Sequence, residues 1–426
     1  MIKARGGSLW RHPDFMRLWS AETISQFGTQ VTLLALPLTA VLVLHAGPFR
    51  VGLLSAVEFM PFLLLGLPAG VWVDRIRRKP ILIGGDLLRA AALISVPIAA
   101  ALDVLALPQL FVVGFLTGVG TVFFDVAYQS YLPSLVDRDR LPEGNAKLEI
   151  SRSGAQLAGP GIAGVLIEAL TAPVAILVDA ISYVASAACI AWIRRPEHVV
   201  ERPPAQERGM RREIAQGLRF VLGHPLLRPI AFCTGISNLF YAMTLAILLV
   251  FAVRSLDLNA GQIGIALSLG NLGFLAGALI ADRLERLIGL GASIVAPAVL
   301  FGVGGVCFGV ATPETAIVLL ISGTALLGFT AVVYNVNQVS LRQAITQENM
   351  LGRMNATMRF VVWGTIPLGS FLGGVFATVF GLRSTLWIAA LGATVSFVPL
   401  VFSPVPRLRT MTEAVQQYGG PAGEGA

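Results

Sequence analysis

The chain has 426 residues, of which 55% are hydrophobic and 13% are charged, and its formal net charge is +7. A water-soluble core of this size cannot bury so large an apolar fraction, which excludes an ordinary soluble globular protein. The three cysteines and four histidines are too few and too scattered for a disulfide framework or a metal cluster. We therefore expect neither a metal nor a cofactor.

Apolar runs of about 20 residues, long enough to cross a hydrocarbon core of about 30 Å, recur along the whole chain. In chain order, the sequence predicts spans at 17–44, 51–73, 80–101, 108–131, 147–170, 173–193, 227–252, 260–281, 290–311, 315–340, 355–379 and 384–403. The segment before the first span has no small-residue cleavage site, so we expect no removable signal peptide. The prediction is an all-α integral membrane protein with 12 transmembrane helices.

Basic residues gather in the loops that follow the even-numbered spans: Arg75, Arg77, Arg78, Lys79, Arg138, Arg140, Arg194, Arg195, Arg283, Arg286, Arg342 and Arg353. The opposite loops hold only Arg50, Arg254 and Arg383. Because basic loops stay in the cytoplasm, this asymmetry predicts a multi-pass protein of the cell (inner) membrane with both termini cytoplasmic. The net positive charge then reflects topology and contact with anionic lipids, so nucleic acid is not an expected partner.

The two halves of the chain resemble each other at an offset of 210 residues. The matching pairs are Asn145 with Asn355, Ala146 with Ala356, Gly154 with Gly364, Gly159 with Gly369 and Gly164 with Gly374. Because each half has an even number of spans, both halves take the same orientation, as in a parallel duplication. We predict two pseudo-symmetric six-helix bundles at 1–193 and 227–405, a cytoplasmic linker at 194–226, and a cytoplasmic, disordered tail at 406–426.

The linker has a helical pattern. Ile214, Leu218, Val221 and Leu222 fall at helical spacing beside several arginines. This pattern fits a basic amphipathic helix lying on the inner headgroups, and it fits an ordinary linker helix equally well.

The absence of a phosphate-binding motif and the presence of carboxylates inside the spans favour secondary transport. Its three lysines, Lys3, Lys79 and Lys147, stand in no phosphate-binding glycine-rich pattern, so we exclude ATP as the energy source. An ion gradient remains, and protons are the natural coupling ion because several carboxylates fall inside spans.

Among the charged residues inside the spans are five carboxylates and two arginines: Glu22, Glu58, Asp86, Asp125, Asp179, Arg89 and Arg359. Each is costly to hold charged in the membrane unless it is paired or hydrated. Asp86, Asp125 and the two arginines lie near the predicted cytoplasmic surface, where we expect structural or gating ion pairs.

Glu58, Glu22 and Asp179 are the candidates for proton coupling, because no cation in the same span neutralises them. A carboxyl group in a dry cavity can hold a proton and release it when the cavity opens to water. For Glu22 and Glu58 the alternative is a local hydrogen bond between helices. For Asp179 the simpler account is snorkelling or bonding to backbone.

The run Gly70-Val71-Trp72-Val73-Asp74-Arg75-Ile76-Arg77-Arg78-Lys79 resembles the loop between the second and third helices of the major facilitator superfamily, although Arg77 replaces a common glycine. The resemblance implies gating roles for Asp74, Arg75 and Arg78, with Asp125 as a partner. A weaker copy stands at Asp282-Arg283, and Asp86 and Arg89 are further gating candidates. As an alternative, the basic cluster serves only as a cytoplasmic anchor.

A second motif lies in the fifth span. Gly154, Gly159, Pro160 and Gly164 resemble the glycine-proline motif of antiporters of this superfamily, although Ala146 and Ala155 occupy positions where the fuller motif has glycines. The resemblance favours export over import. Generic packing of small residues is the rival explanation.

Further segments resemble the bacterial exporter branch that contains macrolide efflux proteins and the enterobactin exporter. They are Phe15-Met16-Arg17-Leu18-Trp19, Ser25-Gln26-Phe27-Gly28, Pro61, Asp86-Leu87-Leu88-Arg89, Asn145-Ala146, Gly159-Pro160, Asp179-Ala180 and Gly217-Leu218-Arg219-Phe220-Val221. This resemblance covers residues from about 12 to 405. It implies proton-driven efflux of bulky amphiphilic compounds.

In this superfamily, the first, fourth, seventh and tenth spans line the central cavity. The resemblance therefore implies a set of substrate-cavity candidates, each of which has helix packing or an interhelical hydrogen bond as the alternative: Gln26, Gln30, Phe123, Phe124, Asn238, Tyr241, Asn271, Asn335, Asn337 and Trp363.

The sequence thus predicts a monomeric, proton-coupled antiporter that exports amphiphilic small molecules such as drugs, antibiotics or siderophores. The alternative of the same fold is an uptake permease for a small metabolite. A membrane enzyme lacks support, because the short loops offer no histidine-acid constellation. A transporter-like scaffold that carries nothing is the remaining alternative.

Overall fold

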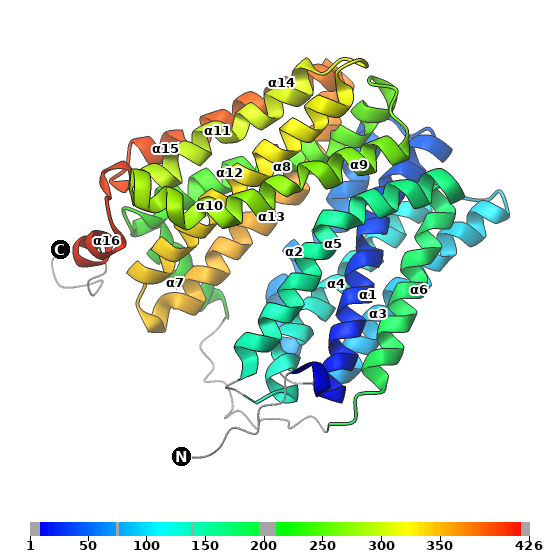
Figure 1. The fold of residues 1–426 in the computed structure, drawn as a ribbon, viewed down its shortest axis with the longest axis horizontal. Helices are drawn as coiled ribbons and strands as arrows, with labels where there is room; N and C mark the ends of the chain where they lie inside the picture. The colour runs from blue at the N-terminus through cyan, green and yellow to red at the C-terminus, as the bar shows by residue number, and fades with distance from the viewer. Residues whose placement is uncertain (1–8, 74–75, 138–139, 196–209, 419–426) are drawn as a thin grey trace. The chain divides into compact units, whose positions relative to one another are not determined.

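The computed structural model describes residues 9–73, 76–137, 140–195 and 210–418, and its regular structure there is entirely helical (Figure 1). The longer helices in the first half are α1 (Pro13–Leu38, continued by a π-helical turn at Thr39–Val43), α2 (Pro48–Val73), α3 (Arg78–Ala101), α4 (Leu107–Leu135), α5 (Leu141–Leu170) and α6 (Ala172–Ala191). A short 3-10 turn, Leu9–Arg11, precedes α1.

The later helices are α7 (Met210–Gly223), α8 (Leu227–Arg254), α9 (Ala260–Gly270), α10 (Leu272–Ile288), α11 (Leu290–Val310), α12 (Ala316–Ile345), α13 (Glu348–Phe380), α14 (Leu382–Val395), α15 (Val398–Val401) and α16 (Met411–Tyr418). The predicted eighth span corresponds to α9 and α10, which are separated only at Asn271.

Eleven helices or helix pairs in the described part of the chain are long and apolar enough to cross a membrane. The remaining long helix, α5, has 30 residues but begins with a polar segment that contains Glu143, Lys147, Glu149 and Arg152. With α5 included, the helices correspond to the 12 predicted spans, as expected for a twelve-helix membrane protein.

Several helices are longer than the apolar runs that predicted them. Residues 282–288 continue α10, so Asp282 and Arg283 belong to a helix rather than to a loop. In the same way α12 continues to Ile345, which places Arg342 inside the helix. The physical reason is that helical hydrogen bonding continues into polar sequence, whereas hydropathy reports only the apolar part.

The chain divides into two compact units. Unit 1 contains Met1–Gly47, Val57–Glu201 and Asn259–Ser268, and unit 2 contains Pro48–Ala56, Arg202–Leu258 and Leu269–Ala426. Two continuous stretches change unit: α2 between Ala56 and Val57, and α9–α10 between Ser268 and Leu269. These positions are 212 residues apart, which agrees with the offset of the internal repeat to within two residues.

Each stretch that changes unit is held by contact between two glycines. In unit 2, a Cβ atom on Gly52 of α2 would lie 2.6 Å from Cα of Gly374 in α13. In unit 1, a Cβ atom on Gly164 of α5 would lie 2.9 Å from Cα of Gly264 in α9. Only glycine allows helix backbones to approach this closely.

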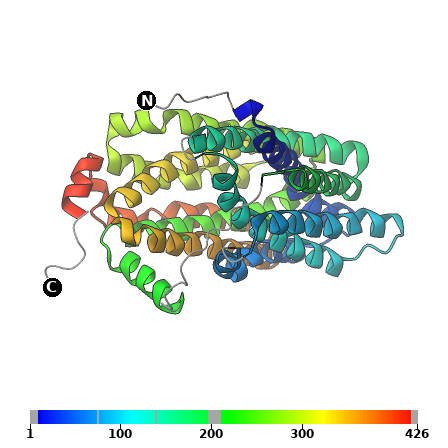
Figure 2. The same ribbon diagram turned by 90° about the horizontal axis from the view of Figure 1, so that it is seen from below.

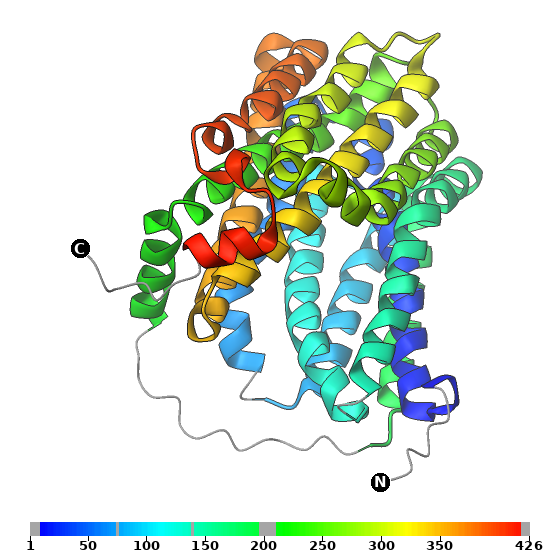
Figure 3. The same ribbon diagram turned by 60° about the vertical axis from the view of Figure 1, so that its left-hand side comes forward.

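The C-terminal segment corrects one prediction. Residues 411–418 form α16, which packs against α12 (Figure 3) rather than forming part of a disordered tail. Its Ala414 is fully buried, and Met411 and Tyr418 join an apolar cluster with residues of α7, α8 and α12. Burial of these apolar side chains stabilises the helix. Residues 419–426 lie outside the described part.

The described part of the predicted linker contains α7, which packs against α13 in unit 2 (Figure 2). Val221 is buried there, and a Cβ atom on Gly217 would lie 2.9 Å from the carbonyl oxygen of Arg353. Leu218 and Leu222 remain exposed. Of the predicted apolar face, Val221 therefore packs within unit 2, whereas Leu218 and Leu222 do not. The side chain of Ile214 lies outside the described part.

Candidate functional site

Unit 1 contains a buried ion pair that lies within one turn of α3. Arg89 Nη2 donates to Asp86 Oδ1 at 2.5 Å, and the two side chains are 4% and 0% exposed. The three-residue spacing of the pair places both groups on the same face of the helix. Gly120 of α4 makes room for the arginine, because a Cβ atom there would lie 2.6 Å from Arg89 Cγ.

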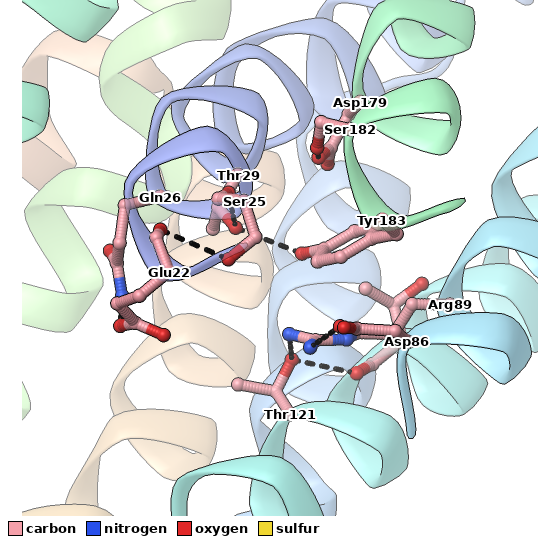
Figure 4. Close-up of polar contacts among 11 residues, drawn as sticks. Glu22, Ser25, Gln26, Thr29, Asp86, Arg89, Thr121, Asp179, Ser182 and Tyr183 are labelled. Atoms are coloured by element: carbon pink, nitrogen blue, oxygen red, sulfur yellow. Dashed lines mark hydrogen bonds and ion pairs between the residues drawn. The ribbon is translucent and has the colours of Figure 1, made fainter. Parts of the chain in front are cut away.

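Two aromatic rings complete the surroundings of Arg89. Its guanidinium carbon lies 4.0 Å from the ring centroid of Tyr183 on α6 and 4.6 Å from that of Phe124 on α4. Nη1 also reaches Thr121 Oγ1 at 3.5 Å (Figure 4). The cation is thus neutralised by Asp86 and further stabilised by two π faces.

Asp179 lies on α6, one turn before Tyr183, and is 0% exposed. Thr32 of α1 donates a short hydrogen bond to Oδ2, and Ser182 donates to Oδ1 at 2.9 Å. The absent side chain of Gly28 allows this contact, because a Cβ atom there would collide with Ser182 and Asp179. Both carboxylate oxygens have side-chain donors, so neither snorkelling nor bonding to backbone, the account predicted for Asp179, describes it.

One further hydrogen bond joins α1 to the tyrosine whose ring covers Arg89. The hydroxyl groups of Thr29 and Tyr183 lie 2.8 Å apart (Figure 4). Tyr183 therefore contacts α1 through its hydroxyl group and Arg89 through its ring. Side chains from α1, α3, α4 and α6 thus form two adjacent polar clusters, which we together call the Arg89 network. One contains Thr29, Asp86, Arg89, Thr121, Phe124 and Tyr183, and the other contains Thr32, Asp179 and Ser182.

Glu22 occupies a different environment. Its side chain lies with Gln26 on the opposite side of α1 from Tyr183 in Figure 4, and the residue is 7% exposed. Gln26 Nε2 donates to Oε1 at 2.7 Å. Oε2 is buried and has no hydrogen-bond partner among the described residues. This carboxyl group therefore has one hydrogen bond and no ion pair within the described ranges.

Glu58 stands two residues beyond Ala56, where α2 changes unit. Its side chain is half-buried and makes no hydrogen bond or ion pair with any residue that the structure describes. Its backbone carbonyl lies against Gly118 of α4, where any Cβ atom would collide with it. The position of Glu58 is thus fixed by the backbone, while its carboxyl group has no partner among the described residues.

The predicted gating residues fall on several helices. Asp74 and Arg75 lie outside the described residues. Arg78 begins α3, and Asp125 is an exposed residue of α4. Asp282 and Arg283 are exposed on α10.

Lys79, counted above among the basic loop residues, has a structural contact in unit 1. Its Nζ donates to the carbonyl oxygens of Ala191 and Ile193 at 2.9 and 2.7 Å. These carbonyls lie at the end of α6, where a helix leaves backbone acceptors unsatisfied and where a cation is favoured. The basic cluster therefore contributes to the packing of unit 1 at this position.

The residues of the antiporter-like motif differ in what they contact. Gly159 lies against Gln30 of α1, where a Cβ atom would be 2.5 Å from Gln30 Cβ, and Gly164 contacts α9 as described above. Pro160 is buried, whereas a Cβ atom on Gly154 would meet no other atom within 4 Å. Close helix packing thus accounts for Gly159 and Gly164 but not for Gly154.

Most of the substrate-cavity candidates have contacts within their own unit. In unit 1, Gln26 bonds to Glu22, Gln30 contacts Gly159, and Phe123 stacks on Trp72 with ring centroids 6.0 Å apart. Phe124 is 3% exposed beneath Arg89. Its burial makes it a packing residue in this structure rather than a cavity wall.

The candidates in unit 2 behave similarly. Asn238 donates to the carbonyl of Thr234 at 2.8 Å, and Tyr241 packs edge-on against Phe301. Asn337 is 1% exposed and donates to a carbonyl one turn earlier in its own helix, so we reassign it to the core. The remaining candidates are Asn271 between α9 and α10, Asn335 on α12 and the half-buried Trp363 on α13.

The apolar pattern did not predict that two polar residues of α12 are buried. Arg342 is 7% exposed and Gln338 is 2% exposed. The apolar run that predicted this span ends at residue 340, so Arg342 was assigned to a loop. Its spacing of four residues from Gln338 and eight from Tyr334 is the signal that places all three on one helical face.

The comparisons agree with this architecture and with the predicted family. The family model for a transmembrane secretion effector matches residues 8–422. The chain is 27% identical to the multidrug efflux pump Tap of Mycolicibacterium fortuitum, over 94% of this chain and 97% of that protein. It is 22% identical to macrolide efflux protein A of Streptococcus pyogenes, over 93% of this chain and 97% of that protein.

The enterobactin exporter EntS of Salmonella choleraesuis is 24% identical, with 81% of each chain covered. Among solved structures, a bacterial homologue of the iron transporter ferroportin superposes with a TM-score of 0.71 at 18% identity, covering 93% of this chain and 99% of that chain. The structural likeness supports the fold alone. On the match to its family model, the chain is a non-enzymatic multi-pass membrane transporter that belongs to the transmembrane secretion effector family of the major facilitator superfamily.

Proposed function

We propose that the chain is a proton-coupled secondary exporter that moves amphiphilic small molecules, such as drugs, antibiotics or siderophores, out of the cell by alternating access. The efflux proteins among its relatives support export. The proton as coupling ion is supported by the carboxyl groups buried in helices of unit 1. We further propose that it works as a monomer with both termini in the cytoplasm, as the basic loops predict.

The observation that carries proton coupling is the environment of Glu22. Its carboxyl group is buried, has one neutral hydrogen-bond donor, and leaves its second oxygen without a partner among the described residues. Burial in an apolar layer without a bonded cation penalises a charged carboxylate, so this group can hold a proton. Access to water then favours ionisation and release of that proton.

Glu58 is the second proposed coupling group because of its place in α2. It stands beside the position where the helix changes unit, and its carboxyl group has no partner in the described ranges. A change of charge at Glu58 would act on α2 next to the point where the helix passes from its packing in unit 2 to its packing in unit 1. Asp179 ranks below both, because two hydroxyl donors already satisfy its carboxylate.

The predicted halves and gate remain part of this proposal. Six-helix bundles at 1–193 and 227–405 would move relative to each other, with Asp74, Arg75 and Arg78 acting with Asp125 as one gate. The pair Asp282-Arg283 would be its weaker counterpart. Asp86 and Arg89 would keep the helices of unit 1 together during the movement, because their ion pair links to α1, α4 and α6.

Transport in proteoliposomes with an imposed pH gradient tests the proposal. Efflux of a radiolabelled macrolide should be lost in Glu22→Gln and Glu58→Gln, while binding of the macrolide measured without a gradient should persist. Glu168→Gln is the matched control, because Glu168 is an exposed carboxylate of α5. It should transport like the unmodified chain.

Three outcomes would refute parts of the proposal. Gradient-driven transport at the normal rate in both glutamine variants would remove Glu22 and Glu58 as coupling groups. Accumulation rather than depletion of the compound in intact cells would indicate an uptake permease. No flux of any compound in a broad panel would indicate a scaffold.

A further inference from the structure

The buried polar face of α12 in unit 2 is distinct from the Arg89 network. Asn335, Gln338 and Arg342 are spaced three and four residues apart, which places them on one face of the helix. Gln338 Nε2 donates to Asn335 Oδ1 at 2.8 Å. Gln338 and Arg342 are 2% and 7% exposed, so these two residues lie inside the protein, whereas Asn335 at the other end of the face is exposed.

Two atoms on this face are buried without a hydrogen-bond partner in the described part of the chain: Arg342 Nε, which is a donor, and Gln338 Oε1, which is an acceptor. The guanidinium group of Arg342 also has no ion pair with any described residue. Arg89, the comparably buried arginine of unit 1, has a carboxylate and two aromatic rings. Nε of Arg89 is also buried without a partner, so the difference is that Arg342 has neither a paired carboxylate nor a covering aromatic ring among the described residues.

The helices packed against α12 provide Arg342 with no counter-charge. The sequences of α8, α11 and α12 itself contain no aspartate or glutamate. The helices α10 and α16 also pack against α12 and carry Asp282, Glu285 and Glu413. None of these three carboxylates forms an ion pair with Arg342, and Glu413 instead accepts a hydrogen bond from the backbone of Arg409 at 3.0 Å.

The hydroxyl group of Tyr334, which lies on the same face, is already engaged. Tyr334 Oη lies 2.9 Å from the hydroxyl of Thr234 and donates to the carbonyl of Ile230 at 3.4 Å. These polar groups of α8 and α12 thus bond to one another, and none of them forms a hydrogen bond with the side chain of Arg342.

A largely buried guanidinium group without an ion pair is costly, because arginine stays charged under all physiological conditions. Within a membrane helix, such a group marks a ligand or ion pathway by default. Its planar donors match the oxygens of a carboxylate, sulfonate or phosphate better than any neutral acceptor. The unpaired Gln338 Oε1 beside it requires a donor from the same ligand.

We propose that Arg342 and Gln338 form a subsite for an anionic group of the transported compound. Arg342 binds an oxyanion of the cargo, and Gln338 Oε1 accepts a hydrogen bond from an adjacent N–H or O–H group of the same molecule. This inference rests on the proposed export of amphiphiles and narrows the cargo to amphiphilic acids. A lipid phosphate would satisfy the same chemistry, so the experiment must separate the two sources.

The test uses two fluorescent probes with the same aromatic skeleton. 1-Anilinonaphthalene-8-sulfonate carries a sulfonate beside an N–H group, and N-phenyl-1-naphthylamine carries only the N–H group. Dissociation constants are measured by fluorescence titration of the full chain in nanodiscs of phosphatidylcholine, with empty nanodiscs subtracted. No gradient is applied, so the result does not depend on proton coupling.

Arg342→Gln should raise the dissociation constant of the sulfonate probe by about tenfold or more, as expected for loss of a charge-assisted bond. The constant for the neutral probe should stay within about twofold. Arg342→Lys should keep part of the preference for the anion. Arg286→Gln, which removes an exposed arginine of unit 2, is the control and should change neither constant.

Equal changes for both probes, or no change for either, would overturn the subsite. The thermal midpoint of Arg342→Gln should be unchanged or higher, since an unpaired charge is removed; a lower midpoint with loss of both probes would show a structural role instead. In nanodiscs that contain phosphatidylglycerol, weaker sulfonate binding by the unmodified chain but not by Arg342→Gln would assign the site to lipid. Failure of the unmodified chain to bind either probe would count against export of amphiphiles itself.

Discussion

Removing the charge of Asp86 should strongly destabilise unit 1. In Asp86→Asn, Arg89 would remain 4% exposed with only two aromatic rings and one distant hydroxyl as partners. Breaking a buried ion pair by removing one member costs about 3–5 kcal/mol, because the other charge stays buried. The two cation–π contacts offset only about 1–2 kcal/mol of such a cost and are present in both proteins.

The opposite substitution should cost less. In Arg89→Met, the remaining Asp86 can take up a proton and become neutral, whereas an arginine cannot give up its proton. The double variant Asp86→Leu with Arg89→Met replaces the pair with apolar side chains, and we expect it to be close to neutral or more stable than the unmodified chain by about 1–4 kcal/mol.

Equilibrium unfolding measures these differences. Titration with sodium dodecyl sulfate in mixed micelles, followed by fluorescence of the six tryptophans, gives the free energy of unfolding for each variant. Tyr183→Phe is a useful control, because it keeps the ring over Arg89 and removes only the hydroxyl bonded to Thr29. The reasoning fails if Asp86→Asn lies within about 1 kcal/mol of the unmodified chain, or if Arg89→Met is the less stable of the two.

Three further changes test separate contacts. Gly28→Ala should lower the free energy of unfolding by about 1–3 kcal/mol because its Cβ atom collides with Ser182 of α6, whereas Gly154→Ala, with open space around it, should change it by less than about 1 kcal/mol; equal effects would contradict the close packing of α1 on α6. Lys79→Met removes two charge-assisted bonds to the end of α6 and should cost about 1–3 kcal/mol, measured against Lys147→Met. The His224→Asn variant should unfold with less dependence on pH than the unmodified chain.

The sign of the pH effect at His224 follows from its hydrogen bonds. Nδ1 accepts from the backbone N–H groups of Leu226 and Leu227 at 3.2 and 3.4 Å, which only the neutral ring can do on that nitrogen. Burial lowers the pKa of His224 below its ordinary value, against a smaller opposing effect of the Tyr418 carbonyl. A lowered pKa gives stability that is present above the unfolded value of about 6.5 and is lost as the pH falls through the folded value.

The thermal midpoint should therefore fall on acidification below about pH 6.5. Asparagine can still cap the start of α8, so His224→Asn should keep the fold and reduce this fall. An identical pH profile for the variant and the unmodified chain would show that His224 does not contribute to it.

The number and order of the membrane helices could be predicted from the sequence, because the length and hydropathy of a span are local properties. The structure and the family comparison agree with those predictions. Helix ends could not be predicted as well: α10 and α12 continue past their apolar runs into polar sequence. For this reason Arg342, which the sequence places in a loop, lies in a helix and is buried in the structure.

The chemical types of the site residues were also visible in the sequence, since a carboxylate or arginine inside an apolar run is conspicuous. The pair Asp86 and Arg89 could be found in this way, because its spacing of three residues is local. The partners of Asp179 could not, because Thr32 is 147 residues away. Their contact depends on how α1 and α6 are rotated and on the space left by Gly28.

The sequence by itself therefore determined that this chain crosses a membrane many times, that its halves repeat, and that charged groups lie within its helices. Only the tertiary structure decided which of those groups have partners. Both carboxylate oxygens of Asp179 accept hydrogen bonds from side chains, and Arg89 has a carboxylate partner although its Nε is unpaired, while Glu22, Glu58 and Arg342 have no ion pair among the described residues. The physical reason is that polarity belongs to a residue, whereas its compensation depends on the packing of distant segments.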